Sequence, residues 1–289
     1  MTLGSTIGIF APSSSIIPEK FEVGLQILKG HGYNTIVHPQ TYIGAGEQTQ
    51  IAGTTEQKVQ AYKELVADQS VGLIIAATGG NRACFLLDEL APLKSHKPIM
   101  GFSDVTALLS LHYKLGTPSI FGPTIQTLAR MDENHIHLTF EKLNSLTQTA
   151  TEIEMVDSIT LNKGEVTAPI FAATLSVLNT LIGTKHMPDL NGHILVIEDI
   201  GEELNSIDRM LWHLFSVVNP SAIIFGQFVD LKDTGRPYGQ NIKHVLAAYT
   251  QKLGIPVIMN APIDHYGRIF PITCGQTAKL DATNRILIL

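Results

Sequence analysis

The sequence predicts an α/β protein of two domains: an N-terminal domain with a mostly parallel sheet flanked by helices, and a smaller C-terminal α/β domain. Three observations lead to this fold class. The chain has 289 residues, 44% of them hydrophobic, which is enough for a large core. Short apolar segments alternate with amphipathic ones, as strands and helices do around a parallel sheet. Residues 71–77 carry no charge, which indicates a strand buried on both faces.

The N-terminal domain is expected over residues 1–150. A helix begins at Pro18 and stops near Gly30 to Gly32, and Thr54 with Gln57 resembles the capping box of a second helix. Further helices are expected from about Phe85 to Leu90 and over 104–115. Strands are predicted at 6–10, 35–37, 71–77 and 98–102.

The C-terminal domain is expected over residues 165–289. The stretch 124–151 is more polar and loses the strand–helix alternation, so the connection between the domains is placed there and near 162–165. The alternation then resumes. Helices are predicted at about 172–182, around 207–214 and at 242–253, and strands at 193–197, 222–225, 256–259, 278–280 and 285–289.

Composition excludes several classes of protein. The formal net charge is −6, and no cluster of five or more Lys and Arg occurs, so nucleic-acid binding is not expected. The N-terminus lacks a basic segment followed by a long apolar one, and the longest apolar run is too short to span a bilayer. We therefore expect a soluble cytoplasmic protein without a membrane partner.

Metal and cofactor motifs are missing as well. Cys84 and Cys274 lie far apart and form no CxxC pair, which excludes a disulfide framework and a zinc ribbon. The histidines show no ligand spacing, and the close pair His135 and His137 is expected to be solvated. Neither the dinucleotide-binding pattern nor the P-loop pattern occurs. No metal and no cofactor are expected.

A serine follows one of the predicted buried strands directly, in the segment GFSDVT at 101–106. Ser103 would then lie at the carboxyl edge of the sheet, where open α/β proteins bind ligands, beside the free N–H groups of a helix N-terminus. These groups suit the stabilisation of an oxyanion. The alternative is that Ser103 or Asp104 only caps the helix.

A serine nucleophile needs a base, and the base needs an acceptor that orients it. Glu198 and Asp199 end the predicted strand near 193–197, and His265 lies in a loop after the strand at 256–259. Each observation has a plainer explanation. The acidic pair can start a helix, since acidic residues favour first turns, and a lone loop histidine can be solvated or structural.

Together these segments resemble the serine peptidase family S66, which contains the LD-carboxypeptidases and the microcin C self-immunity proteins. The resemblance covers nearly the whole chain. It rests on the segments IGIFAPSS (7–14), TGGN (78–81), GFSDVTAL (101–108), PDLNGHIL (188–195) and IED (197–199), and on the ten-residue step from His265 to Gly275. The serine segment matches the family's G-[YF]-S-D-x-T-x-L pattern, its most specific signature.

The resemblance implies a metal-free serine mechanism and assigns its parts. Ser103 would be the nucleophile, His265 the general base and acid, and Glu198 the residue that orients the histidine. The backbone N–H groups of Asp104 and Gly80 are the candidates for the oxyanion hole. The active site is expected in the cleft between the domains, and the protein is expected to be a homodimer.

Three residues after the predicted strand at 71–77 are candidates for substrate binding: Gly79, Asn81 and Arg82. Arg82 could bind a substrate carboxylate through two hydrogen bonds. The alternative is an exposed arginine at the start of a helix.

The resemblance leaves the substrate open between its two branches. The first is a cytoplasmic muropeptide, cut at the L,D bond that releases terminal D-alanine during peptidoglycan recycling. The second is a peptidyl or aminoacyl nucleotide with an amide-like bond. A non-catalytic two-domain binding protein is the alternative outside the family's chemistry.

This sequence departs from the family pattern at three places. The family's G-H is Asp264-His265 here, its G-G-N-L is Ala172-Ala173-Thr174-Leu175, and Thr273 replaces a proline. The triad stays complete, and the three departures bear on the substrate preference.

Overall fold

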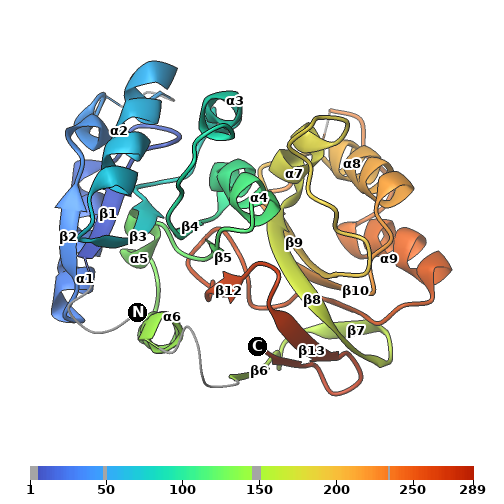
Figure 1. Cartoon of the computed structure of the whole chain (residues 1–289). Helices are drawn as coiled ribbons and strands as arrows, with labels where there is room; N and C mark the ends of the chain where they lie inside the picture. The colour runs from blue at the N-terminus through green and yellow to red at the C-terminus, as the bar shows by residue number, and fades with distance from the viewer. Residues whose placement is uncertain (1–5, 48–50, 145–150, 234) are drawn as a thin grey trace. The chain divides into compact units, whose positions relative to one another are not determined.

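A computed structural model describes residues 6–47, 51–144, 151–233 and 235–289 (Figure 1). Contacts divide the chain into two compact units. The first unit comprises Met1–Thr149 with Ile269–Pro271, and the second comprises Ala150–Arg268 with Ile272–Leu289. Each unit combines a sheet with helices, which confirms the predicted α/β class.

Parallel strands form the centre of the first unit. They follow the spatial order β2-β1-β3-β4-β5, with every neighbouring pair parallel. Ile7, Ile9, Leu73 and Ile75 are fully buried, as predicted for a parallel sheet covered on both faces. The strands are β1 (Thr6–Phe10), β2 (Asn34–Val37), β3 (Val71–Ala76), β4 (Ile99–Gly101) and β5 (Ser119–Phe121).

The helices of the first unit begin largely where the sequence predicts. Pro18 opens α1, and the Thr54–Gln57 capping box at the start of α2 is confirmed, with both of its hydrogen bonds present. The helical elements are α1 (Pro18–Gly30), η1 (Pro39–Tyr42), α2 (Thr55–Ala67), η2 (Ala83–Leu86), α3 (Leu87–Leu90), η3 (Ser103–Val105), α4 (Thr106–Lys114), α5 (Ile125–Leu128) and α6 (Glu133–Asn144), where η marks a 3-10 helix.

Helices α5 and α6 lie within 124–151, the stretch in which the sequence loses the strand–helix alternation and for which no helix is predicted. Helix α6 is mostly polar, and it buries only a narrow stripe of three residues, Thr139, Phe140 and Leu143. The Phe140 ring stacks on His31 with 3.7 Å between ring centroids. This stripe is too narrow to stand out in the sequence, so the helix depends on its packing against the rest of the unit.

The second unit has a mixed sheet of eight strands in the order β6-β14-β13-β8-β9-β10-β11-β7. Strands β8 to β11 are parallel, and the outer pairs are antiparallel. Residues between the two expected domains form the edge strands β6 and β7. The strands of this sheet are β6 (Glu152–Glu154), β7 (Ile159–Asn162), β8 (Glu165–Thr174), β9 (Ile194–Ile200), β10 (Ala222–Val229), β11 (Val257–Met259), β13 (Thr277–Asp281) and β14 (Ile286–Ile288). The short strand β12 (Ile272–Thr273) is not part of it.

Three helices accompany this sheet: α7 (Leu175–Leu181), α8 (Leu204–Val217) and α9 (Ile242–Leu253). Figure 1 shows them grouped beside β9 and β10, with α8 in contact with both of the others. The helix expected from 172 begins only at Leu175. The reason is that Ala172 to Thr174 continue β8 and pair with β9, Thr174 lying opposite Glu198.

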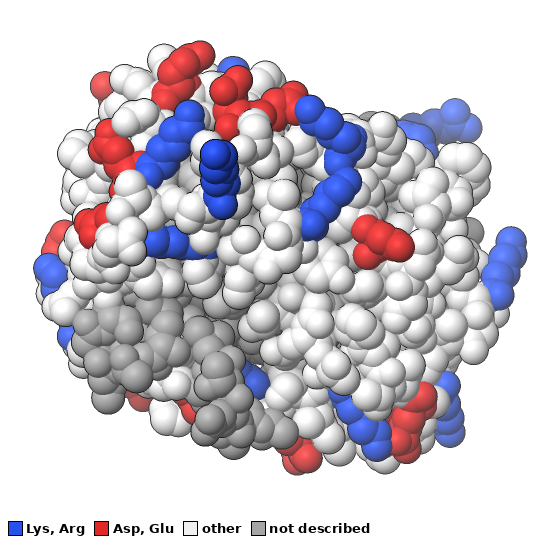
Figure 2. Space-filling view, in the orientation of Figure 1, with Lys and Arg blue, Asp and Glu red and all other residues white. Residues whose placement is uncertain are grey.

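Surface charge is mixed in sign. Figure 2 shows acidic and basic side chains interspersed over the first unit around α2 and α3. Among the described residues, no helix is long and apolar enough to cross a membrane.

Candidate active site

Ser103 lies two residues after the end of β4, at the turn into η3. Its side chain does not cap the helix that follows. Its φ angle is +61°, in the left-handed region that costs a non-glycine residue about 1–3 kcal/mol. The first residues of η3 and α4 receive no hydrogen bond from a capping side chain, so the helix-cap interpretation of Ser103 and Asp104 is wrong. A strained strand-to-helix turn is typical of serine nucleophiles, because it exposes the hydroxyl at the edge of the sheet.

Of the two glycines after β3, Gly79 lies against this turn and Gly80 lies against Ser14. A Cβ atom added to Gly79 would lie 2.8 Å from Cβ and 3.0 Å from Oγ of Ser103. Gly80 has a φ of +125°, and a Cβ there would lie 2.0 Å from Oγ of Ser14. Only glycine therefore allows the backbone to pass this close to Ser103 at position 79 and to Ser14 at position 80.

Asp104 and Lys58 form a buried charged cluster beside Ser103. Asp104 Oδ2 accepts a hydrogen bond of 2.8 Å from the Ala83 amide, and Lys58 Nζ donates one of 2.6 Å to the Ser13 carbonyl. Burial raises the pKa of Asp104, while the Ala83 amide and the Lys58 charge oppose the increase. Burial lowers the pKa of Lys58 to about 8, partly offset by Asp104. The Asp104–Ala83 bond holds the turn after β4 against the segment after β3, and the Lys58–Ser13 bond holds α2 against the segment after β1.

Sequence reasoning missed Lys58. It lies on α2 on the same side as the buried Tyr62 and Leu65. Its spacing from these apolar residues, four and seven positions, was the available signal.

Arg82 has left-handed backbone with a φ of +83°, and its guanidinium lies over the Phe85 ring, 4.4 Å from the centroid. It lines an open pocket of about 830 Å³ together with Lys58, Glu47 and Glu56. Asn81 beside it is exposed. Arg82 is thus half-buried and stacked, so the simple exposed-arginine interpretation does not describe it.

Glu198 and His265 meet within the second unit. Glu198 is fully buried near the end of β9, where its Oε2 forms an ion pair with Nδ1 of His265. Its Oε1 accepts a hydrogen bond from the Thr174 hydroxyl on the neighbouring strand β8. On the other side, a Cβ added to Gly226 of β10 would lie 3.0 Å from Cβ of Glu198 and 2.6 Å from the Ile263 carbonyl oxygen. Three parallel strands thereby fix the carboxylate.

Asp199 has a different role from its neighbour. It accepts hydrogen bonds from the Ser176 amide at 2.7 Å and hydroxyl at 3.1 Å, so it binds the first turn of α7. Burial and the nearby charge of Glu198 raise the pKa of Asp199 to about 7. The helix-start interpretation of this acidic pair thus describes Asp199, although for α7 and not for the following helix, while Glu198 faces the histidine.

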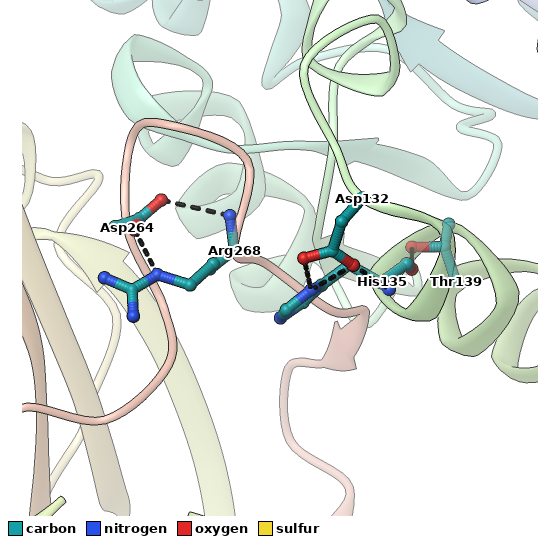
Figure 3. Close-up of polar contacts among 5 residues, drawn as sticks. All are labelled: Asp132, His135, Thr139, Asp264 and Arg268. Carbon is teal, nitrogen blue, oxygen red and sulfur yellow. Dashed lines mark hydrogen bonds and ion pairs between the residues drawn. The ribbon is translucent and has the colours of Figure 1, made fainter. Parts of the chain in front are cut away.

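The loop that carries His265 is closed by the residues on either side of it (Figure 3). Asp264 is buried, and its carboxylate accepts hydrogen bonds from the Tyr266 amide at 2.7 Å, the Arg268 amide at 3.0 Å and Arg268 Nε at 2.7 Å. The Asp264 amide donates to the Arg268 carbonyl at 2.7 Å. The residue that departs from the family pattern thus organises the loop.

Figure 3 also shows a contact within the first unit, where both Asp132 carboxylate oxygens lie 2.9 Å from Nδ1 of His135. His135 therefore has a carboxylate partner and is not merely solvated, whereas His137 is exposed as predicted. Across the described residues, no three His, Cys, Asp or Glu side chains are grouped in a way that could hold a metal ion.

Comparisons with known proteins cover both units. The family model for the LD-carboxypeptidase N-terminal domain matches residues 7–122, which include Ser103. The model for the LD-carboxypeptidase C-terminal domain matches residues 167–280, which include Glu198 and His265.

Relatives of two kinds align over nearly the full chain. The murein tetrapeptide carboxypeptidase of Pseudomonas aeruginosa is 26% identical, over 97% of this chain and 94% of its own. The microcin C7 self-immunity protein MccF of Escherichia coli is 25% identical, over 99% and 93%.

Solved structures of the same two kinds share the fold. The muramoyltetrapeptide carboxypeptidase from Oxalobacter formigenes superposes with a TM-score of 0.83 at 26% identity, covering 98% of this chain and 97% of its own. MccF in complex with glutamyl sulfamoyl guanosine superposes with a TM-score of 0.86 at 20% identity, covering 100% and 96%.

Proposed function

The chain belongs to the LD-carboxypeptidase family of serine peptidases, S66, and on that premise we propose that it hydrolyses the L,D-peptide bond of cytoplasmic muropeptides. The substrate is a murein tetrapeptide, and the products are the tripeptide and free D-alanine. Ser103 is the nucleophile, His265 the general base and acid, and Glu198 the residue that orients His265. The similarity to the murein tetrapeptide carboxypeptidase of Pseudomonas aeruginosa and to the muramoyltetrapeptide carboxypeptidase of Oxalobacter formigenes supports this choice of substrate.

The proposed reaction is acyl transfer in two steps. His265 Nε2 takes the hydroxyl proton of Ser103 as Oγ attacks the carbonyl carbon, and the backbone N–H groups of Gly80 and Asp104 stabilise the oxyanion. The C–N bond breaks, and the proton passes to the amine of the departing D-alanine. Water, deprotonated by His265, then attacks the acyl-enzyme and releases the tripeptide with Ser103 restored. Gly79, Asn81 and Arg82 bind the substrate. Arg82 does so by donating two hydrogen bonds to the substrate carboxylate.

The buried contact of Glu198 with Nδ1 of His265 is the observation that carries the proposal. A carboxylate that holds the proton on Nδ1 leaves the lone pair on Nε2, the nitrogen that must accept the serine proton. A binding protein without catalytic activity has no need for a fully buried glutamate in this position.

Hydrolysis of an aminoacyl or peptidyl nucleotide is the second candidate function. It is favoured by the similarity to MccF, which has been solved with glutamyl sulfamoyl guanosine and with aspartyl sulfamoyl adenosine. The two candidates use the same triad and differ only in the group on either side of the scissile bond.

Parallel assays separate these functions. Wild-type protein and the Ser103→Ala variant are incubated with murein tetrapeptide and with aspartyl sulfamoyl adenosine, and the released amino acids are quantified. We expect the wild type to release D-alanine and the variant to release none. Cleavage of the nucleotide alone would establish the second candidate, and cleavage of neither would favour a binding protein.

The proposal includes a cytoplasmic homodimer, as the resemblance to the family implies. Light scattering on the purified protein and fractionation of cells that express it measure these two properties. A monomer, or a protein found outside the cytoplasm, would contradict this part of the proposal.

A further inference from the structure

The loop between Asp264 and Arg268 is held at both ends by the same pair of residues. Hydrogen bonds join them in both directions. The Asp264 amide donates to the Arg268 carbonyl, and the Arg268 amide donates to the Asp264 side-chain carboxylate. The Arg268 Nε–H then donates to the second carboxylate oxygen at 2.7 Å. Only three residues lie between, and the first of them is His265. Any movement of the Asp264 carboxylate is therefore transmitted to the histidine within one peptide unit.

We propose that Asp264 and Arg268 are positioning residues that fix the imidazole of His265 for proton transfer, an inference that rests on the proposed function. In this proposal they act through the backbone of the loop and not on the reacting atoms. Their effect is to hold the backbone of residue 265 at the place where Nδ1 meets Glu198. This assigns a role to the aspartate that stands where the family pattern has glycine, since glycine has no carboxylate that could close the loop.

Burial of Asp264 strengthens its contact with Arg268. The Asp264 side chain is 3% exposed, whereas the Arg268 side chain is 46% exposed. A buried carboxylate needs its hydrogen bonds, and it has three donors from two residues. The guanidinium approaches from the more exposed side, so its removal leaves the carboxylate without a charged donor but opens no cavity in the core.

A second contact, between Tyr266 and Asp230, lies on the outer side of the same loop. The Tyr266 hydroxyl donates to Asp230, and the Tyr266 side chain is half exposed. It holds the outer side of the loop, whereas the Asp264–Arg268 pair closes its base. Tyr266→Phe therefore serves as a comparison within the loop, and we expect it to change turnover by less than about 3-fold.

The variants Asp264→Asn and Arg268→Met test the proposal. Asparagine keeps an oxygen that accepts from both backbone amides but places an NH₂ group against Arg268 Nε, and methionine keeps the chain length without the donor. We expect each variant to lower kcat on murein tetrapeptide by roughly 10- to 100-fold, with KM within about 3-fold, because small misplacement of a catalytic group has effects of this size. The double variant should be no worse than the poorer single variant, since the two residues act as one contact.

Phosphonylation of Ser103 by a fluorophosphonate supplies a readout that needs no substrate. Its rate depends on the serine being activated by His265, so it should fall by the same factor as kcat. Asp281→Asn is the matched control. Asp281 likewise accepts hydrogen bonds from the Thr283 and Asn284 amides, at 2.9 Å each, but its turn carries no histidine. We expect this variant to retain wild-type kcat and labelling rate.

Two outcomes overturn the inference. One is wild-type kcat and labelling in Asp264→Asn and Arg268→Met while His265→Ala loses both. The other is a loss of kcat that matches only the unfolded fraction measured by circular dichroism. If His265→Ala itself keeps full activity, the proposed function has failed, which is a different result.

Discussion

Glu198 and His265 face each other in the second unit, with Oε2 of the buried glutamate against Nδ1 of the imidazole. The glutamate comes from the end of β9 and the histidine from the loop after β11. Two neighbours determine where the glutamate lies. The Thr174 hydroxyl donates to its other oxygen, and Gly226 packs closely against its Cβ. The position of the glutamate against His265 is therefore set by the parallel part of one sheet.

Thr174→Val tests the contribution of the hydroxyl that binds Glu198. Valine has nearly the same shape but donates no hydrogen bond, so the buried carboxylate loses one partner. We expect the free energy of unfolding to fall by about 1.5–3 kcal/mol and kcat to fall roughly 10-fold. Urea unfolding and D-alanine release measure the two effects. Thr174→Ser retains the donor and should remain close to wild type; equal losses in both variants would contradict the assignment.

Asp199 makes the stability of the second unit depend on pH. Its pKa is about 7 in the folded protein and near 4 when unfolded, so in this range the folded state holds a proton that the unfolded chain has released. Stability therefore decreases as pH rises from about 4 to about 7. Asp199→Asn removes this dependence while keeping an acceptor for Ser176.

Urea unfolding of both proteins at pH 5 and pH 8 checks this. The variant should gain about 2–3 kcal/mol relative to wild type between the two pH values. Other titrating groups cancel in this difference. A constant difference between the two proteins would show that Asp199 is ionised throughout.

Much of the fold follows from local patterns. The apolar strand β3, the proline that opens α1 and the capping box of α2 all act over a few residues, and all are predicted correctly. Helix α6 is not, because only tertiary packing stabilises its narrow buried stripe. Helix α7 begins later than predicted because Thr174 pairs with Glu198, a residue 24 positions away.

The candidate site divides in the same way. Ser103, Glu198 and His265 lie at the ends of predicted strands or in the loops after them, and the motifs around them are specific. Lys58 escaped notice because a single lysine on a helix is usually exposed, and only the fold buries it beside Asp104. The partner of Asp264 is four residues away, yet the sequence shows no sign that the two side chains close a loop.

Backbone strain at Ser103 gives a prediction that is independent of substrate. Glycine adopts a φ of +61° without penalty, whereas alanine does not. Both Ser103→Gly and Ser103→Ala should be inactive, but the glycine variant should be about 1 kcal/mol more stable in urea unfolding. Ser110, within α4, is the control. There the alanine variant should be more stable than the glycine variant, because alanine favours a helix. Equal stability of the two Ser103 variants would argue against a strained turn.

Gly226→Ala tests whether the close packing of β10 against Glu198 is needed for activity. The new methyl group would meet the Ile263 carbonyl oxygen at 2.6 Å, so either β10 or the segment leading to His265 must shift. We expect a loss of about 1–3 kcal/mol in unfolding free energy and a clear decrease in kcat. Gly30→Ala, where nothing lies within 4 Å, is the control and should be neutral or slightly stabilising. Full activity in Gly226→Ala would show that Glu198 tolerates displacement.

Mapping of the residue modified by a fluorophosphonate tests the central claim most directly. Wild-type protein and His265→Ala are incubated with the reagent, digested, and analysed by mass spectrometry. We expect one modified peptide in the wild type, with the adduct on Ser103, and labelling at least about 100-fold slower in His265→Ala, because the serine then lacks its base. An adduct on another residue, or equal labelling of Ser103 in both proteins, would contradict the assignment of Ser103 and His265 as nucleophile and base.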